Sequence, residues 1–392
     1  MSVTFEAAAS AVRDALTDAG RGLVEREAMV ELVALSAVAG EHLLVIGPPG
    51  TAKSEAVRRT ARALGGSYFE YLLGRFTEPS ELFGPVDLRK LREGLVETET
   101  SGMLPEAEVA FLDEVFLGST AILNTLLGIL NERTFRRGHT RMRCPLRVCV
   151  GASNGLPEDD SLAAFADRFL TRIFVEPVPD PRLEELLAGG ASLWGEGEAR
   201  ATSLESLDVL AQAAREADLT AVRPHLAHAL RSLRSAGIGL SDRRAVKVQK
   251  LMAAAAALAG RRVPSTADLW PLVYAVPTKE AQALARDVLR DVLAASENPA
   301  LAAAALEASA GPRARAQRIA TAGEVLLAER PADGDADALA AWRLKLEGVA
   351  REMDAGFAPE ALSEELKALR ARLSEALAPV ASVAPVAAGV AA

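Results

Sequence analysis

A lysine followed by a serine, placed after a glycine- and proline-rich turn, points most directly to chemistry in this sequence. Apolar residues at 42–46 precede the turn, and an amphipathic stretch at 55–64 follows it. This order predicts a strand, a phosphate-binding loop and a helix. The residues expected to bind the phosphates of a nucleotide are Gly47, Pro48, Pro49, Gly50, Thr51, Ala52, Lys53 and Ser54.

The chemistry expected of this loop is anion binding. Backbone N–H groups of the turn and the helix N-terminus attract phosphate. Lys53 is expected to reach the β- and γ-phosphates, and Ser54 to place its hydroxyl on Mg²⁺. The usual pattern, G-x-x-x-x-G-K-[ST], has a glycine where this chain has Ala52. The methyl group of alanine costs little free energy unless the backbone there needs a positive φ. The alternative is a chance turn before a helix.

Two adjacent carboxylates form the second candidate group. The apolar residues 109–112 predict a strand, and Asp113 and Glu114 follow at its carboxyl end, where ligands of a parallel sheet bind. Asp113 is expected to hold Mg²⁺, through water or together with Ser54. Glu114 is expected to polarise the water that attacks the γ-phosphate. The alternative is a solvated acidic turn.

Asn154 ends another expected strand, at 146–152, beside the acidic one. An amide there can hydrogen-bond the attacking water and the γ-phosphate. We therefore interpret Asn154 as a nucleotide sensor, with an ordinary turn as the alternative. Leu23 and Val24, in a short apolar turn before the loop, are candidates to cover the nucleotide base, although ordinary packing would explain them too.

Arginines could supply positive charge to the reaction. Arg168 is a candidate finger acting on a neighbouring subunit's nucleotide, because a guanidinium stabilises transition-state charge on phosphoryl groups. Arg172 is the reserve candidate, and a structural pair between Asp167 and an arginine is the alternative. Arg243 opens a helix after Ser241, its expected N-cap, and could reach back to the γ-phosphate.

Five more arginines lie in short β segments between residues 133 and 144. They could belong to a solvated hairpin, or to a basic surface facing a neighbouring subunit's nucleotide or a central pore. They are Arg133, Arg136, Arg137, Arg141 and Arg143.

The composition limits the class of protein. The chain has 392 residues, 50% of them apolar and 4% aromatic, which favours a helix-rich protein with a sizeable core. A net charge of −9 argues against a dedicated nucleic-acid binder. Cys144 and Cys149 fit no metal spacing or disulfide framework. Without a targeting signal or an uninterrupted apolar span, we expect a cytoplasmic protein that binds neither membrane nor nucleic acid stably.

The expected organisation is an α/β nucleotide-binding core followed by helices. Residues 1–180 form the core, with a parallel sheet and an inserted β-hairpin at 86–100. Strands then stop, and 181–275 predict an all-helical lid. Amphipathic helices predict a helical bundle over 276–378. The tail at 379–392 is expected to be disordered.

These motifs, in their order and spacing, resemble the MoxR branch of the AAA+ ATPases, with the RavA-type subfamily the most similar. The resemblance covers residues 5–275, about two-thirds of the chain. The stretches that carry it are 22–26 (GLVER), 47–54 (GPPGTAKS), 75–85 (RFTEPSELFGP), 104–108 (LPEAE), 111–114 (FLDE), 122–127 (ILNTLL), 152–154 (ASN) and 241–244 (SDRR).

The resemblance implies an AAA+ P-loop fold with a helix-2 insert at 74–100 and a ring, usually a hexamer, with ATP and Mg²⁺ between subunits. It assigns Lys53 and Ser54 to Walker A, Asp113 and Glu114 to Walker B, and Asn154 to sensor 1. It also assigns Arg168 as the finger and Arg243 as sensor 2. Family members often work with a partner bearing a von Willebrand factor A domain. RavA-type proteins carry a β-rich domain late in the chain. Because no strand is expected after residue 276 here, we do not expect this domain.

The sequence thus predicts an ATP hydrolase that remodels or assembles protein complexes, with its protein substrate unidentified. Three alternatives stay open: a nucleotide-gated scaffold with little turnover, a DNA-associated motor, and the ATPase subunit of a metal-chelatase-like complex. The acidic charge balance weighs against the DNA motor.

Overall fold

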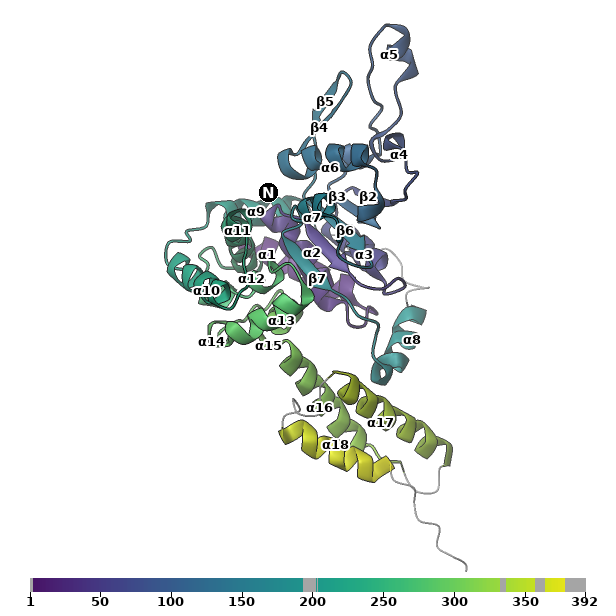
Figure 1. The fold of residues 1–392 in the computed structure, drawn as a ribbon, viewed down its shortest axis with the longest axis vertical. Helices are drawn as coiled ribbons and strands as arrows, with labels where there is room; N and C mark the ends of the chain where they lie inside the picture. Colours follow the sequence, from purple (N-terminus) through teal and green to yellow (C-terminus); the bar gives the residue numbers. More distant parts are fainter. Residues whose placement is uncertain (1–2, 193–201, 203, 332–335, 357–363, 378–392) are drawn as a thin grey trace, which may run out of the picture. The chain divides into compact units, whose positions relative to one another are not determined.

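The computed structural model describes most of the chain, and the predicted disordered tail at 379–392 lies outside the described part (Figure 1). The described residues are 3–192, 202, 204–331, 336–356 and 364–377. The chain divides into two compact units, which are treated separately below. The first comprises 1–178 with 185–311, and the second comprises 179–184 with 312–392.

The first unit is built on a five-stranded parallel sheet with the order β2-β3-β6-β1-β7. β1, β3 and β6 fall where apolar runs predicted strands, and the α/β fold is confirmed. Continuous apolar runs are typical of parallel strands that are covered on both faces. The strands are β1 (Leu43–Ile46), β2 (Tyr68–Leu72), β3 (Val109–Asp113), β6 (Val148–Ser153) and β7 (Thr171–Phe174).

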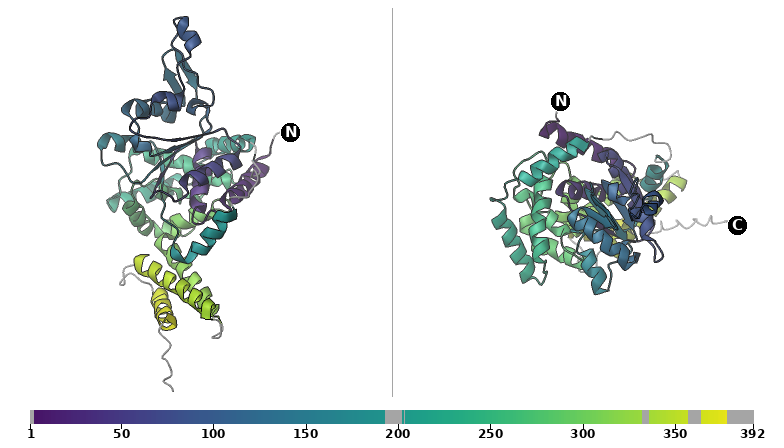
Figure 2. Two further views of the ribbon diagram at one scale, coloured as in Figure 1. Left: turned by 90° about the vertical axis from the view of Figure 1, so that its right-hand side faces the viewer. Right: turned by 90° about the horizontal axis from the view of Figure 1, so that it is seen from above.

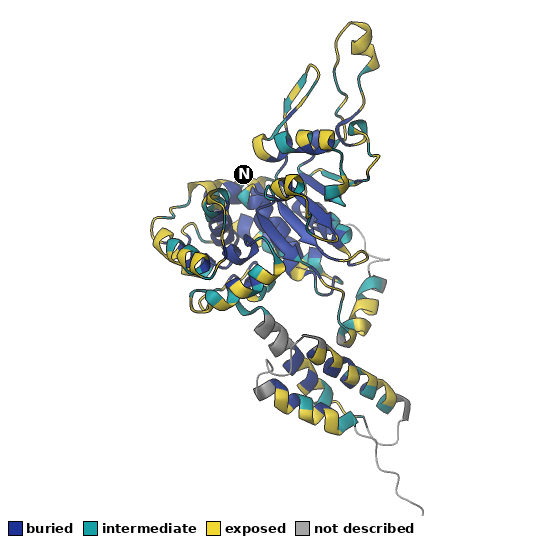
Figure 3. Cartoon of the chain, in the orientation of Figure 1, coloured by how far each residue is buried: buried dark blue, intermediate teal, exposed yellow. Residues whose placement is uncertain are grey.

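Helices cover both faces of this sheet, because its strands carry apolar side chains on both faces. The strand β1 is an example. Leu43 and Val45 point into one buried cluster, whereas Leu44 and Ile46 point into the other. This alternation follows from the two-residue period of a strand. The first cluster contains side chains of α1 (Phe5–Gly20), α2 (Glu27–Ala39) and α3 (Lys53–Leu64). The second contains those of α6 (Thr120–Glu132) and α7 (Asp160–Ala166), and dark blue marks both buried layers in Figure 3.

Two projections extend from the core beside α6 (Figures 1 and 2). One is the hairpin of β4 (Thr134–Arg137) and β5 (Thr140–Arg143). The other is the insert, in which α4 (Pro79–Phe83) leads to α5 (Leu88–Arg92). We expected two strands at 86–91 and 95–100. The insert instead pairs at its base, through a bridge between Val86 and Thr98, and forms a helix near its tip because Asp87 caps the N–H groups of Arg89 and Lys90.

The lid helices pack on the same cluster as α1 and α2. Ser241 caps α11 (Asp242–Leu258) as predicted, by accepting a hydrogen bond from the Arg244 N–H at 3.3 Å. The bundle expected from residue 276 onward is divided between the two units. Its first helices, α13 (Lys279–Val288), α14 (Arg290–Leu293) and α15 (Ala302–Ala310), bury their apolar side chains in the first unit. The other α-helices of this unit's described residues are α9 (Leu204–Glu216), α10 (Arg223–Ser235) and α12 (Pro271–Tyr274), together with α8 (Leu183–Ser192) from residue 185 onward.

The described residues of the second unit form a small bundle of three α-helices around its own apolar cluster. They are α16 (Pro312–Ala328), α17 (Ala336–Gly356) and α18 (Glu364–Leu377). Trp342 on α17 donates its indole N–H to the Leu326 carbonyl at 2.6 Å, which joins α17 to α16. Among the described residues, no helix has the length and apolar character needed to cross a membrane.

Candidate functional site: a phosphate-binding loop beside two carboxylates

The sheet order brings the candidate residues together. β1, β6 and β3 are consecutive neighbours, so the segments that follow them leave the same edge of the sheet. The loop begins after β1, Asn154 follows β6, Asp113 ends β3, and Glu114 follows it. The Gly47 N–H also donates to the Ser153 carbonyl at 3.0 Å, which joins the start of the loop to the end of β6. This edge is where ligands of parallel sheets bind.

Glycine is needed at two positions of the loop for different reasons. A Cβ on Gly47 would lie 2.3 Å from the Val175 carbonyl oxygen, so no larger residue fits there without displacing backbone. Gly50 has φ of +76°, a conformation that glycine adopts at little cost. The Thr51 hydroxyl donates to the Pro48 carbonyl at 2.9 Å and closes the turn.

Ala52 does adopt the conformation that the sequence left open, because its φ is +57° and its ψ is 28°. This left-handed conformation costs a residue with a Cβ roughly 1–2 kcal/mol. No side chain of the described residues caps the α3 N-terminus that follows Ala52. Its first N–H groups therefore lack side-chain partners and suit a bound anion.

Lys53 points back into the loop. Its ammonium donates to the carbonyl oxygens of Gly47 at 2.7 Å and Pro48 at 3.0 Å. The side chain is buried, and this burial lowers the Lys53 pKa while the charges of Asp113 and Glu114 act to raise it. A buried cation that feels the charges of two carboxylates, at the start of a helix without a side-chain cap, fits a polyphosphate with its metal ion.

Arg26 is a buried residue of the site that the sequence did not single out as functional. Its Nε donates to the Thr51 carbonyl of the loop at 2.7 Å, and its Nη2 to the Glu176 carbonyl after β7 at 2.8 Å. Arg26 thus fixes the back of the loop. The preceding Leu23 and Val24 are both buried, and Leu23 belongs to the main cluster, which agrees with ordinary packing. Contact of either residue with a base stays a prediction.

The carboxylates of Asp113 and Glu114 have different hydrogen-bond partners. Asp113 accepts the Glu114 N–H on its Oδ1 at 3.0 Å. Glu114 has a left-handed backbone with φ of +48°, and strain of this kind clusters at functional sites. Its Oε1 accepts a hydrogen bond from Asn154 Nδ2 at 2.7 Å. The structure therefore brings together the proposed water activator and the proposed sensor.

The residues around the loop fit Mg²⁺ in the form in which nucleotide sites hold it. Mg²⁺ keeps several waters and takes one or two protein oxygens together with substrate phosphates. Ser54 in the first turn of α3 and Asp113 at the end of β3 are the oxygen donors available. Within the described part of the chain, no group of three or more His, Cys, Asp or Glu side chains could hold a metal without such phosphates.

Arg168 lies at the other edge of the sheet. It precedes β7, whose first residue pairs with Leu43 at the start of β1. Its Nε is buried and makes no hydrogen bond to any described residue. The structural pair considered as an alternative does exist, but it joins Asp167 to Arg244 at 2.9 Å and leaves Arg168 out of it.

Arg172, the reserve finger, is occupied inside the fold. Its Nη1 donates to the Pro277 carbonyl at 2.8 Å and its Nη2 to the Ala166 carbonyl at 3.0 Å. Burial, followed by the nearby Arg244 charge, lowers the Arg172 pKa to about 10. These contacts give Arg172 a role in joining β7 to the segment before α13.

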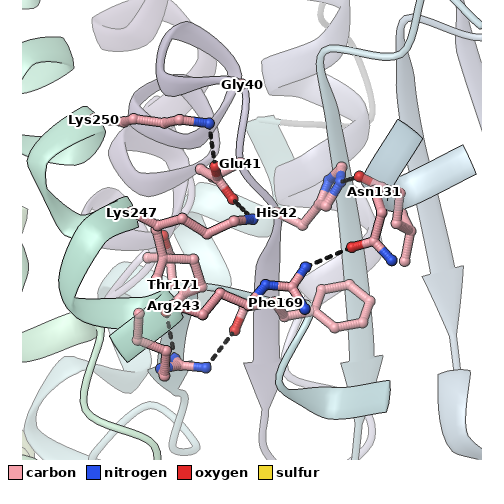
Figure 4. A network of polar contacts seen from close by, with 12 residues as sticks. Gly40, Glu41, His42, Asn131, Phe169, Thr171, Arg243, Lys247 and Lys250 are labelled. Atoms are coloured by element: carbon pink, nitrogen blue, oxygen red, sulfur yellow. Dashed lines mark hydrogen bonds and ion pairs between the residues drawn. The ribbon is translucent and has the colours of Figure 1, made fainter. Parts of the chain in front are cut away.

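Arg243 does not face the loop of its own chain. Its Nη2 donates to Asn131 Oδ1 at 2.6 Å (Figure 4). One and two turns later on α11, Lys247 and Lys250 bind the carboxylate of Glu41, which immediately precedes the β1 region. This face of α11 therefore lies at the amino end of β1, on the same side as Arg168. β1 alone separates the two edges by roughly 13 Å, so reaching back to the chain's own γ-phosphate is not the role this position supports.

Comparison with known proteins agrees with this fold and site. A family model described as the MoxR domain of MoxR–vWA–β-propeller ternary systems matches residues 10–213. A model of the AAA lid domain matches residues 216–287. A Cytophaga hutchinsonii crystal structure, of a protein assigned as an ATPase, has a TM-score of 0.59 at 16% identity. It covers 74% of this chain and 96% of its own, and supports the fold.

Two uncharacterised proteins of Methanocaldococcus jannaschii are 39% and 38% identical to this chain over 248 residues. The match covers 63% of this chain and 64% and 66% of theirs, just under two-thirds of those relatives. A Mycobacterium tuberculosis protein named chaperone MoxR1 is 26% identical over 183 residues, which are 45% of this chain and 48% of its own. Because the MoxR model matches more than half of a chain that also has a matching AAA lid, the chain belongs to the MoxR-type AAA+ ATPases.

Proposed function

We propose that this chain hydrolyses ATP with Mg²⁺ and uses the energy to remodel or assemble protein complexes. The observation that carries the proposal is the 2.7 Å hydrogen bond between Asn154 and Glu114, formed beside the strand that feeds the phosphate loop. A carboxylate held by an amide at this place is suited to orient water for in-line attack on a γ-phosphate.

Each residue then has a defined task. Lys53 and the N–H groups of the loop and of α3 bind the phosphates, and exchange the Lys53 carbonyl contacts for phosphate oxygens. Ser54 and Asp113 would hold Mg²⁺, whose positive charge would stabilise negative charge on the phosphate oxygens. Glu114 accepts a hydrogen bond from the attacking water, and Asn154 keeps that carboxylate in place.

We propose that the site is completed by a second copy of the chain. Arg168 and Arg243 lie at the edge of the sheet opposite the loop, so a neighbour can present both to this chain's nucleotide. Such head-to-tail contact generates a ring when its rotation closes. The family resemblance makes a hexamer the expected number, with both arginines stabilising charge that develops on the phosphoryl group.

The partner is proposed from the matched family model, whose description names vWA and β-propeller components. The name of the M. tuberculosis relative, chaperone MoxR1, supports a remodelling role. We therefore propose a von Willebrand factor A domain protein as the partner. The same description directs the proposal to MoxR–vWA–β-propeller systems in preference to the RavA-type subfamily that the sequence suggested.

The first test is steady-state ATPase activity against protein concentration, for the wild type and Glu114→Gln. We expect activity per subunit to rise with concentration and to vanish in the variant, while both bind a fluorescent ATP analogue. Wild-type turnover no faster than that of Glu114→Gln at every concentration, with and without a vWA partner, would contradict the enzyme and favour the nucleotide-gated scaffold.

A mixing experiment tests the shared site. The single variants Lys53→Ala, Arg168→Ala and Arg243→Ala are each expected to be inactive alone. Lys53→Ala is then mixed with Arg168→Ala, and in a second experiment with Arg243→Ala. In an equal mixture, random assembly restores roughly a quarter of the interfaces with both wild-type halves. Arg290→Ala, which removes an exposed arginine on α14, serves as the control and should be fully active alone. No recovery on mixing, despite proven subunit exchange, would refute the trans assignment.

A further inference from the structure

Glu41 is a buried carboxylate that the proposed mechanism does not use. Only 2% of its side chain is exposed, and it lies between the end of α2 and the start of β1. Its Oε2 accepts a hydrogen bond from Lys247 Nζ at 2.5 Å, and its Oε1 accepts one from Lys250 Nζ at 2.7 Å (Figure 4). Because a buried charge is costly unless it is paired, this carboxylate depends on the two lysines.

The backbone around Glu41 holds it in a fixed place. Gly40 follows the last residue of α2 with φ of +66°, a conformation that commonly ends a helix. The Gly40 N–H donates to the Ala37 carbonyl at 3.3 Å, and the Glu41 N–H donates to the Ser36 carbonyl at 3.0 Å. These two hydrogen bonds form a Schellman motif. The carboxylate therefore extends from a rigid turn of the core.

Both lysines lie on the face of α11 that also carries Arg243. The three residues are spaced by four and then three positions, so their side chains lie one above the next along the helix. From this face, Arg243 Nη2 reaches Asn131 Oδ1 at 2.6 Å. Asn131 is exposed and uncharged, so Arg243 can exchange this contact for a phosphate oxygen. The lysines hold the helix, whereas the arginine can move.

Arg244 attaches α11 to the core at a different point. It pairs with Asp167 at 2.9 Å and donates to the Leu170 carbonyl at 2.6 Å, which fixes the first turn of the helix. Attachment at one turn fixes the position of a helix but constrains its direction less. Glu41 holds α11 one and two turns farther along, and so fixes the direction in which the helix runs.

We propose that Glu41 is a positioning residue for Arg243. Its carboxylate holds α11 in the direction that presents Arg243 to a nucleotide bound by the neighbouring copy of the chain. The inference rests on the trans role given to Arg243 in the proposed function. Glu41 itself lies two residues before β1, at the end of that strand opposite the phosphate loop. Positioning matters because a displacement of about 1 Å can lower a rate about a hundredfold.

The test is the ATPase activity of Glu41→Gln, alone and mixed with Lys53→Ala. The variant should bind a fluorescent ATP analogue as the wild type does, because its own loop is unchanged, while kcat should fall about tenfold to a hundredfold. In an equal mixture, the Lys53→Ala subunits carry an intact Glu41 and can serve the nucleotide of their neighbours. Random assembly should then restore about a quarter of wild-type activity, whereas a defect in the variant's own site would leave about one-twentieth or less.

Two further variants support this test. Asp287→Asn is the matched control, because it removes a carboxylate that pairs with Arg290 at 3.1 Å on the surface of the same unit, and it should have wild-type activity. Lys247→Gln breaks the contact from the α11 side and leaves Glu41 paired with Lys250, so it tests the inference even if Glu41→Gln does not fold. Lys247→Gln should show the same loss of kcat and the same recovery on mixing.

Three results would overturn the inference, and they can be told apart. If Glu41→Gln and Lys247→Gln keep the wild-type kcat while Arg243→Ala is inactive, Glu41 has no positioning role and the proposed function stands. If mixing gives only the activity expected for a defect in the variant's own site, Glu41 supports its own subunit instead. If Arg243→Ala is as active as the wild type, the trans role in the proposed function fails and the inference fails with it.

Discussion

Glu31 on α2 attaches the first turn of α15 to the core of the first unit. Its carboxylate oxygens accept the backbone N–H groups of Ala303 at 3.2 Å and Ala304 at 2.7 Å. Burial raises the Glu31 pKa from 4.5 to about 7, although the two N–H donors act in the opposite direction. The nearby charges of Glu27 and Glu307 add to the rise. The free energy of unfolding of the first unit should therefore depend on pH through the Glu31 carboxyl.

The sign follows from the direction of the pKa change. The folded state holds the Glu31 proton more tightly than the unfolded chain does, where the pKa is near 4.5. The resulting stability is fully present below about pH 4.5 and is lost as pH rises through about 7. A pKa difference of this size corresponds to about 3 kcal/mol. Glu31→Gln keeps one oxygen, which can accept one of these two bonds, and removes the titration.

The assay is urea unfolding of wild type and Glu31→Gln at a series of pH values. The variant's free energy of unfolding, relative to wild type, should increase by about 3 kcal/mol between about pH 4.5 and about pH 8. Glu280→Gln, at an exposed position on α13, is the matched control and should follow the wild-type curve. Parallel curves for wild type and Glu31→Gln would refute the reasoning, because they would show that Glu31 titrates alike in both states.

Three further predictions concern the loop and the sensor. Ala52→Gly relieves the left-handed alanine and, after the entropy cost of glycine, should raise the free energy of unfolding by about 0.5 kcal/mol; a loss of stability would contradict the strain. Gly47→Ala should abolish binding of a fluorescent ATP analogue, whereas Gly155→Ala, whose Cβ would meet nothing within 4 Å, should bind normally. Asn154→Ala should lower kcat about tenfold with little change in KM, because a hydrogen bond to a charged group is lost; an unchanged kcat would remove Asn154 from the mechanism.

Much of the candidate site could be predicted because it is local in sequence. The phosphate loop needs a strand, a glycine-rich turn and a helix in immediate succession, and residues 43–64 form that succession. Asp113, Glu114 and Asn154 could be placed together because apolar strands precede them and parallel strands share a carboxyl edge. The positive φ of Ala52 could not be predicted, since an alanine in a loop gives no signal of a left-handed backbone.

The positions that depend on tertiary packing could not be read from the sequence. A helix start at Ser241 was predictable, but the edge of the sheet that Arg243 approaches depends on how α11 packs. Arg26 belongs to a stretch that carries the family resemblance, but no role was assigned to it, and only the fold shows its contact with Thr51. The sequence of the insert favoured a strand over 86–91. Instead, the Asp87 side chain caps the start of α5 there.

The salt bridge between Asp167 and Arg244 has a consequence for the two arginines beside it. Asp167 precedes Arg168, and Arg244 follows Arg243, so the 2.9 Å contact clamps the neighbours of both residues. The Arg244 side chain is 3% exposed, and it also donates to the carbonyls of Phe169 and Leu170. Removing one partner of a fully buried pair costs about 3–5 kcal/mol, and the cost here is smaller because the Asp167 side chain is 32% exposed. The pair therefore joins the lid to the core and keeps Arg168 and Arg243 at a fixed separation, and a rotation of the lid against the core would first have to break it.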